Sequence, residues 1–223
     1  PQTAKRVDFL ISGYGEEKQA NVVLIELKQW SDLQAIPGRD GLVETYTGNA
    51  MRQVVHPSYQ AWSYAMLISD YNDSVQREKI SIHPCAYLHN YRRFGEDPLD
   101  AKQYEVYLQD APVFTRGEVD KLRHFIKNSV KAGDNKKLIY KIDSGRIKPS
   151  KSLQESIAKM LKGNREFIML DEQKVIYEEI LEESRLSIKD GKKRVIIVQG
   201  GPGTGKSVVA VNLLAELTKE DQV

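Results

Sequence analysis

The chain has 223 residues, of which 40% are hydrophobic and 29% charged, and its formal net charge is +2. This length accommodates one large domain or two small ones, and the composition is that of an ordinary globular protein. No apolar run approaches the roughly 20 residues that cross a bilayer, which excludes a membrane-spanning helix. The single cysteine, Cys85, excludes an internal disulfide and cysteine-rich zinc sites, and it predicts a cytoplasmic location.

Two apolar segments near the start of the chain predict strands that pair as a hairpin, VDFLI at 7–11 and NVVLIELK at 21–28. The polar, glycine-containing segment 31–50 predicts turns. HPSYQAWSYAMLIS predicts a helix that begins at Pro57, since proline is favoured in the first turn. His56 precedes it and is interpreted as helping to start the helix, with a phosphate contact as the alternative.

Further elements are predicted along the rest of the chain. Two of them are strands, at 79–90 and, as a weaker candidate, at 104–108. Three are helices: one follows the capping box Thr115-x-x-Glu118, one follows the capping box Ser152-x-x-Glu155, and one begins near Asp171. Between residues 116 and 151, eleven Lys or Arg stand against four Asp or Glu. Such a run could follow a phosphate backbone, or it could be a solvated helix face and a linker.

A glycine-rich segment, QGGPGTGKS at 199–207, matches the pattern G-x-x-x-x-G-K-[ST]. The apolar run RVIIV at 194–198 predicts a buried strand before it, and SVVAVNLLAEL predicts a helix after it. Glycines let backbone N–H groups converge on phosphate oxygens at the helix N-terminus, which predicts an ATP site. Lys206 would reach the β- and γ-phosphates, and the Ser207 hydroxyl would bind Mg²⁺. The predicted ATP-binding residues of this segment are Gly200, Gly201, Gly203, Thr204, Gly205, Lys206 and Ser207.

The position of this loop predicts a truncated domain, because Ser207 lies only sixteen residues before Val223. A phosphate-loop NTPase also needs a downstream acidic residue for Mg²⁺ and a group that positions water. We therefore expect a fragment of a longer protein, which would not hydrolyse ATP by itself. The polar segment 144–151 predicts a linker between a first domain at 1–143 and the start of an NTPase domain at 152–223.

Charged residues within the first predicted strands suggest a catalytic site. Glu26 and Lys28 are two apart on one strand, so they project from the same face. They interrupt an apolar segment, where charges are unfavourable unless they pair or bind an ion. Asp8, on the neighbouring strand, is expected to approach Glu26. Two carboxylates can hold Mg²⁺ or Mn²⁺, and a lysine beside them can orient water and stabilise charge on a phosphate. The alternative is a structural ion pair.

A second pattern, Q-x-x-x-Y, adds Gln60 and Tyr64, which share one face of a predicted helix. Both patterns recur elsewhere, as Glu16-x-Lys18, Glu172-x-Lys174, Gln103/Tyr107 and Gln173/Tyr177. The copy at Glu172 is interpreted as a solvated helix face. The copy at Glu26 is selected because only this one lies in an apolar strand that follows an Asp-bearing strand. The copy at Gln60 is selected because it follows both of these strands and opens a helix.

Other candidates have plainer interpretations. His83, Cys85 and His89 offer too few ligands at zinc spacing and are interpreted as ordinary strand residues. Trp30 and Trp62 could stack on bases, although Trp62 is assigned to the core.

The order RVDFLISG, VVLIELKQW and HPSYQAWSY resembles the PD-(D/E)xK nuclease superfamily, whose RecB-type branch adds a Q-x-x-x-Y helix. The resemblance implies a restriction-endonuclease-like α/β core in which Asp8 and Glu26 bind the metal ion and Lys28 is catalytic. Gln60 and Tyr64 would organise the site.

The whole pattern is also similar to bacterial nuclease–helicase fusions related to Schlafen-type helicases. LDEQKVIYEEI at 170–180, followed by GGPGTGKS, resembles the opening of a superfamily 1-like, RecA-like motor. In that resemblance Gln173 corresponds to the glutamine that reads adenine.

The sequence therefore predicts a fragment of an ATP-dependent nuclease–helicase, with an α/β nuclease core, a helical connector and the first strand, loop and helix of a P-loop NTPase. Its expected cofactors are Mg²⁺ or Mn²⁺ and ATP, and its expected partner is nucleic acid, DNA ahead of RNA, with no membrane. Two alternatives stay open. One is a nuclease fold that only grips nucleic acid beside a motor, and the other is a regulatory NTPase whose first domain binds protein.

Overall fold

The structure is a computed structural model that describes residues 6–147 and 167–220. The chain divides into two compact units, one of residues Arg6–Pro149 and one that contains the described residues 167–220. The helix predicted after Ser152 and the end of the predicted linker lie outside the described residues. In the parts of the chain that are described, no helix is long and apolar enough to cross a membrane.

The first unit contains a five-stranded mixed sheet in the order β7-β6-β2-β1-β8 and a three-stranded sheet in the order β3-β4-β5. The strands are β1 Phe9–Tyr14, β2 Ala20–Lys28, β3 Gln34–Ala35, β4 Leu42–Thr47, β5 Ala50–Val55, β6 Ser81–Leu88, β7 Val113–Thr115 and β8 Ala132–Gly133. β1 and β2 pair antiparallel, and β6 and β7 continue the sheet in parallel with β2. The predicted hairpin, the predicted strand at 79–90 and the expectation of an α/β fold are confirmed.

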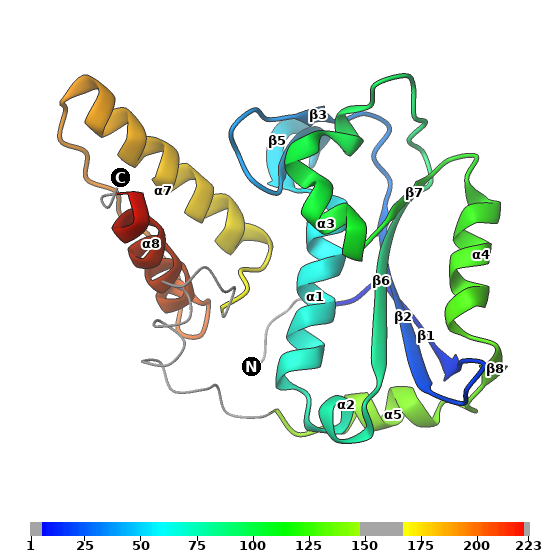
Figure 1. The fold of residues 1–223 in the computed structure, drawn as a ribbon. Coiled ribbons are helices and arrows are strands. Elements are labelled where there is room, and N and C mark those ends of the chain that lie inside the picture. The colour runs from blue at the N-terminus through cyan, green and yellow to red at the C-terminus, as the bar shows by residue number, and fades with distance from the viewer. Residues whose placement is uncertain (1–5, 148–166, 221–223) are drawn as a thin grey trace. The chain divides into compact units, whose positions relative to one another are not determined.

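Helices cover both faces of the larger sheet (Figure 1). The helices of this unit are α1 Pro57–Tyr71, α2 Asp73–Glu78, α3 Glu105–Asp110, α4 Val119–Ser129 and α5 Lys137–Asp143, with short 3-10 turns η1 Pro98–Asp100 and η2 Lys102–Tyr104. α1 and α3 lie on one side of the sheet and α4 on the other. α1 belongs to the long crossover between the parallel strands β2 and β6, which also contains β3, β4, β5 and α2.

The strand candidate at 104–108 is wrong, because this segment belongs to η2 and α3. Tyr104 and Tyr107 are buried, whereas Val106 is 57% exposed. Alternation would have buried residues two apart, but burial three residues apart is the spacing of a helix.

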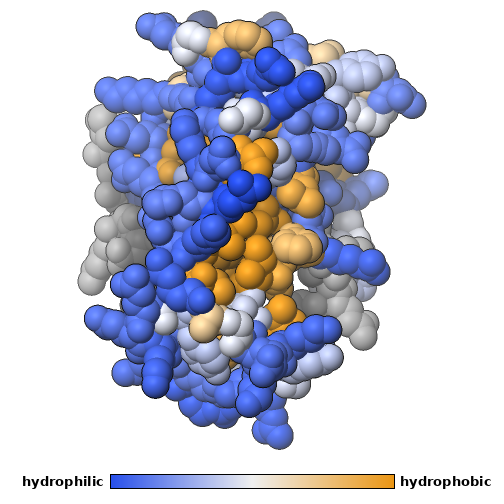
Figure 2. All heavy atoms as spheres, turned by 90° about the vertical axis from the view of Figure 1, so that its right-hand side faces the viewer, coloured by the Kyte–Doolittle hydropathy of each residue, from blue (hydrophilic) through white to orange (hydrophobic). Residues whose placement is uncertain are grey.

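The core lies on both faces of β2, which explains its nearly continuous apolar sequence. Val22 packs with Ile68 of α1 and Leu138 of α5 on one face. Val23 packs with Phe125 of α4 on the other. α4 covers its face only in part. Figure 2 shows an apolar area at the centre of that face. By alternation along the strands, Phe9 and Leu27 lie on the same face as Ile25, and they are 53% and 46% exposed.

The second unit contains α7 Asp171–Asp190 and α8 Lys206–Glu220, which confirms both predicted helices. They pack through a cluster that includes Tyr177, Leu181 and Val209. The buried strand predicted at 194–198 is wrong, because these residues form no strand and Ile197 is 77% exposed. A strand needs a neighbour to complete its hydrogen bonds, and the described part of this unit contains no other strand.

His56 joins the start of α1 to η1. Its Nδ1 accepts the Ser58 N–H at 3.1 Å, and its Nε2–H donates to the Leu99 carbonyl at 3.0 Å. The ring is fully buried and stacks on Tyr104 with 4.3 Å between ring centroids. Its predicted role in starting the helix is therefore confirmed, and burial excludes the alternative contact with phosphate.

The neutral state of His56 makes the stability of this unit depend on pH. Burial, partly offset by the hydrogen bond to Leu99, lowers the pKa of His56 from 6.5 to about 4. The unfolded chain therefore binds more protons than the folded one between these values, so stability falls as the pH falls through this window. At about 1.4 kcal/mol per pKa unit, the loss amounts to roughly 3 kcal/mol.

We predict that His56→Asn, which keeps a cap for the Ser58 N–H but does not titrate, is less stable than the wild type at pH 7.5 and shows a shallower loss between pH 6.5 and 4. Urea unfolding followed by tryptophan fluorescence measures this, since Trp30 and Trp62 both lie in the first unit. Parallel pH profiles for the two proteins would show that His56 is not the titrating group.

Candidate functional site

The register of β1 and β2 brings Asp8 beside Glu26. Phe9 pairs with Ile25 across the hairpin, so the next residues outward on each strand are Asp8 and Glu26. Asp8 lies just outside β1, and its Oδ2 accepts the Leu27 N–H at 2.9 Å. The structure therefore places two predicted metal ligands at one end of the hairpin.

Lys28 is held between a carboxylate and an aromatic ring. Its Nζ donates to Glu26 Oε1 at 2.7 Å, and it lies 5.3 Å from the centre of the Trp30 ring. The side chain of Glu26 is only 4% exposed, and that of Lys28 is 16% exposed. A carboxylate buried to this extent is tolerated because a cation is in contact with it. Trp30 therefore packs beside this charge pair.

The Q-x-x-x-Y pair lies on the helix that covers the same face of the sheet. Ile68 of α1 packs in the cluster around Val22, near the start of β2. α1 runs back along β2, and a helix rises about 1.5 Å per residue against about 3.3 Å for a strand. Gln60, which is two turns before Ile68, is therefore roughly level with Glu26. Gln60 Nε2 donates to the Tyr64 hydroxyl over 3.4 Å.

These residues fit a magnesium site of the kind that uses few protein ligands. Within 6–147 and 167–220, no group of three or more His, Cys, Asp or Glu side chains could hold a metal ion. Mg²⁺, however, usually keeps several waters and binds through one or two carboxylates and substrate phosphates. Asp8 and Glu26 supply that number of carboxylates, and both are hard oxygen donors.

The other copies of the two patterns have structural contacts. Gln103 Nε2 donates to the Ile36 carbonyl at 3.0 Å, and the Tyr107 hydroxyl donates to Asp40 at 2.6 Å. Both contacts tie α3 and the turn before it to the segment between β3 and β4. The Gln103/Tyr107 pair therefore stabilises the loop between β3 and β4 and is not part of a catalytic site.

The interpretation of Glu172-x-Lys174 as a solvated face is wrong for the lysine. Lys174 is 3% exposed, and its Nζ donates to Glu178 at 2.7 Å. Its Nζ also lies 5.2 Å from the centre of the Tyr177 ring. The spacing of Lys174, Tyr177 and Leu181 along α7 is that of a buried helix stripe, which was the signal in the sequence that this lysine is buried.

The glycine-rich loop precedes α8 directly, as the pattern predicts. Gly203 and Gly205 have φ values of 76° and 84°, which favour glycine. Lys206 Nζ donates to the carbonyls of Gly200 and Gly201 at 2.7 Å each. Its ammonium group therefore lies within the loop, beside the start of a helix.

Gln173 reaches this loop from α7, a contact with no local signal in the sequence because 31 residues separate its partners. Its Nε2 donates to the Thr204 carbonyl at 3.0 Å. The structure thus brings Gln173 into contact with the glycine-rich loop of the second unit.

The remaining candidates are mostly structural. Four lysines and arginines of the basic segment, Lys121, Arg123, Lys131 and Lys141, form ion pairs, which favours the solvated-face interpretation. Burial raises the pKa of Cys85 to about 12, so its thiol stays protonated.

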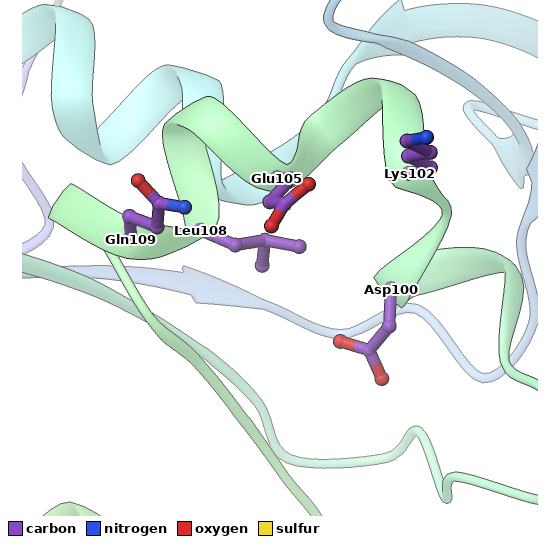
Figure 3. A pocket seen from close by; sticks show the side chains of 5 residues that line it. All are labelled: Asp100, Lys102, Glu105, Leu108 and Gln109. Carbon is purple, nitrogen blue, oxygen red and sulfur yellow. The ribbon is translucent and has the colours of Figure 1, made fainter.

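An open hollow of about 490 Å³ lies beside η1 and α3, where Asp100, Glu105 and Gln109 extend around it (Figure 3). Asp100 is paired with Arg93 at 3.0 Å. None of the predicted site residues lines this hollow, so it adds nothing to the site at Glu26.

The chain is thus a mixed α/β protein with a charged cluster at one end of a hairpin and a glycine-rich loop before a helix. Residues 193–223 match the family described as Schlafen group 3, DNA/RNA helicase domain. No curated protein and no solved structure matches the chain. The match covers the loop and α8, and it indicates a function related to nucleic acid.

We predict that Glu26 and Lys28 are energetically coupled. Lys28→Met leaves a buried carboxylate without its cation and should destabilise the first unit by about 3 kcal/mol, whereas adding Glu26→Gln should recover part of that loss. Urea unfolding of the single and double variants gives the coupling energy, expected to be about 1–3 kcal/mol. Additive effects would mean that the contact does not stabilise the fold.

Proposed function

We propose that the first unit is a metal-dependent nuclease domain and that the second unit binds ATP as the start of a helicase-type motor. The observation that carries the proposal is that the Lys28–Glu26 contact and the bond from the Leu27 N–H to Asp8 lie at the same end of one hairpin. The match to a helicase domain supports the second part. Together they favour an enzyme that processes nucleic acid while a motor moves the strand.

The proposed reaction is hydrolysis of a phosphodiester. Mg²⁺ held by Asp8 and Glu26 would polarise the phosphate and lower the pKa of water. Lys28, which is fixed by Glu26 and Trp30, would orient the attacking water and stabilise the negative charge that develops on the phosphate oxygens. The water oxygen would bond to phosphorus and release a proton to solvent, while the bond to the leaving oxygen breaks and that oxygen takes up a proton from solvent. Gln60 and Tyr64 would orient the substrate backbone.

A second candidate is a module that grips nucleic acid without cutting it. The contact of Lys28 with Glu26 is compatible with this module as well, because a purely structural ion pair has the same geometry. Chelation separates the two functions: a gripping module binds nucleic acid equally well without divalent ions, whereas the nuclease loses cleavage.

We predict that the chain cuts nucleic acid with Mg²⁺ or Mn²⁺ and that Lys28→Ala lowers the cleavage rate by at least about 100-fold, through loss of transition-state charge stabilisation. Single- and double-stranded DNA and RNA, labelled at one end, serve as substrates. Lys127→Ala, at an exposed lysine of α4, is the matched control and should cut like the wild type. Equal cleavage by Lys28→Ala would reject the assignment, and binding without cleavage by any variant would favour the gripping module.

We also predict that Lys206→Ala weakens ATP binding by about 10- to 100-fold, because a charge-assisted hydrogen bond to phosphate is lost. Lys219→Ala, at the other end of α8, is the matched control and should leave the affinity unchanged. Calorimetric titration with ATP and MgCl₂ measures both. An unchanged affinity in Lys206→Ala would show that the loop is not the nucleotide site.

A further inference from the structure

Gln173 makes hydrogen bonds to two places that are far apart in the sequence. Its side-chain Oε1 accepts the Leu170 N–H at 3.0 Å, and its Nε2 donates to the Thr204 carbonyl at 3.0 Å. Its own backbone N–H donates to the Leu170 carbonyl at 2.8 Å. One amide side chain therefore joins the first turn of α7 to the glycine-rich loop.

The bond to the Thr204 carbonyl fixes the direction of the next backbone N–H. In a trans peptide the C=O and the following N–H point in opposite directions, and the chain contains no cis peptide bond among its described residues. Holding the Thr204 carbonyl toward Gln173 therefore aims the Gly205 N–H away from it. Backbone N–H groups of such a loop are the donors that bind phosphate.

Gln173 lies so close to Gly205 that a side chain at position 205 would displace its amide group. A Cβ atom at Gly205 would lie 2.2 Å from Gln173 Nε2. The φ of 84° at Gly205 also favours glycine. Gly205 therefore serves both the turn of the loop and the approach of this side chain.

The backbone of the turn before Gln173 has an unusual conformation, which also indicates a functional position. Asp171 begins α7 with a φ of 35°, a backbone conformation that residues with a side chain rarely adopt. Such strain persists only where surrounding contacts hold it, and it gathers at functional sites. The two bonds of Gln173 with Leu170 close this turn.

We propose that Gln173 is a positioning residue for phosphate binding, which orients the Gly205 N–H through the Thr204 carbonyl. The inference rests on the proposed binding of ATP by the loop. It differs from the adenine-reading role that the family resemblance implies for Gln173, because both ends of its amide are already bonded to the backbone.

The test compares binding of ATP, GTP and inorganic tripolyphosphate to the whole chain and to Gln173→Ala. A positioning residue predicts that all three ligands lose affinity by a similar factor, about five- to tenfold for one hydrogen bond. Glu179→Ala, at an exposed glutamate of α7, is the control and should bind like the wild type. Loss of ATP affinity alone, with GTP and tripolyphosphate unchanged, would overturn the proposal in favour of adenine reading.

Far-UV circular dichroism of Gln173→Ala separates positioning from general damage to the fold. A variant with the helix content of the wild type and weaker binding of all three ligands supports positioning, whereas a loss of helix content would count against it. If the wild type binds none of the three ligands, the proposed ATP site itself fails. If it binds them and Gln173→Ala binds equally well, only the role of Gln173 fails.

Discussion

The structure of the first unit depends on a carboxylate buried in the strand at the centre of its sheet. Glu26 lies on β2 and is its one buried charged side chain, and the four residues before it, Val22–Ile25, are apolar and buried on both faces of the sheet. An isolated charge there would be strongly destabilising, so the contact with Lys28 is what makes the strand compatible with its place in the core. The same contact fixes the direction of Lys28, and Asp8 accepts the backbone N–H of Leu27, which lies between Glu26 and Lys28. The side chains that stabilise this strand, Glu26 and Lys28, are therefore also two of the three that carry the proposed chemistry, with Asp8 beside them.

The arrangement of α1 extends this constraint beyond the hairpin. His56 fixes the start of the helix by accepting a backbone N–H and by donating to a carbonyl of η1. From that fixed start, the helix runs along β2 and brings Gln60 level with Glu26. A helix displaced by one turn would move Gln60 by about 5.4 Å along the sheet and separate it from the charge pair. The buried, neutral histidine is thus a condition for the proposed site, although it touches no substrate.

Local patterns in the sequence predicted the elements whose partners are local. The hairpin, α1, α7 and α8 follow from alternation, a proline at a helix start and helical periodicity. The composition of YEVYL predicted a strand, because tyrosine and valine favour strands. The segment is helical because Tyr104 and Tyr107 are buried and hydrogen-bond to Leu42 and Asp40, which are more than 60 residues away in the sequence. RVIIV has the composition of a strand but has no neighbouring strand in the described residues of its unit. The contact of Gln173 with Thr204 depends on how the second unit folds, so no spacing in the sequence predicts it.

The most direct test of the central claim is whether Asp8 and Glu26 together hold a divalent ion. Electron paramagnetic resonance of Mn²⁺ added to the chain, without nucleotide or nucleic acid, measures the bound fraction. The background carries Ser207→Ala, so that the glycine-rich loop does not contribute. The account predicts one Mn²⁺ bound per chain, with affinity weakened by about tenfold or more in Asp8→Asn, because a charged oxygen ligand is lost. Equal binding with and without Asp8→Asn would contradict it and leave Glu26 and Lys28 as a structural ion pair.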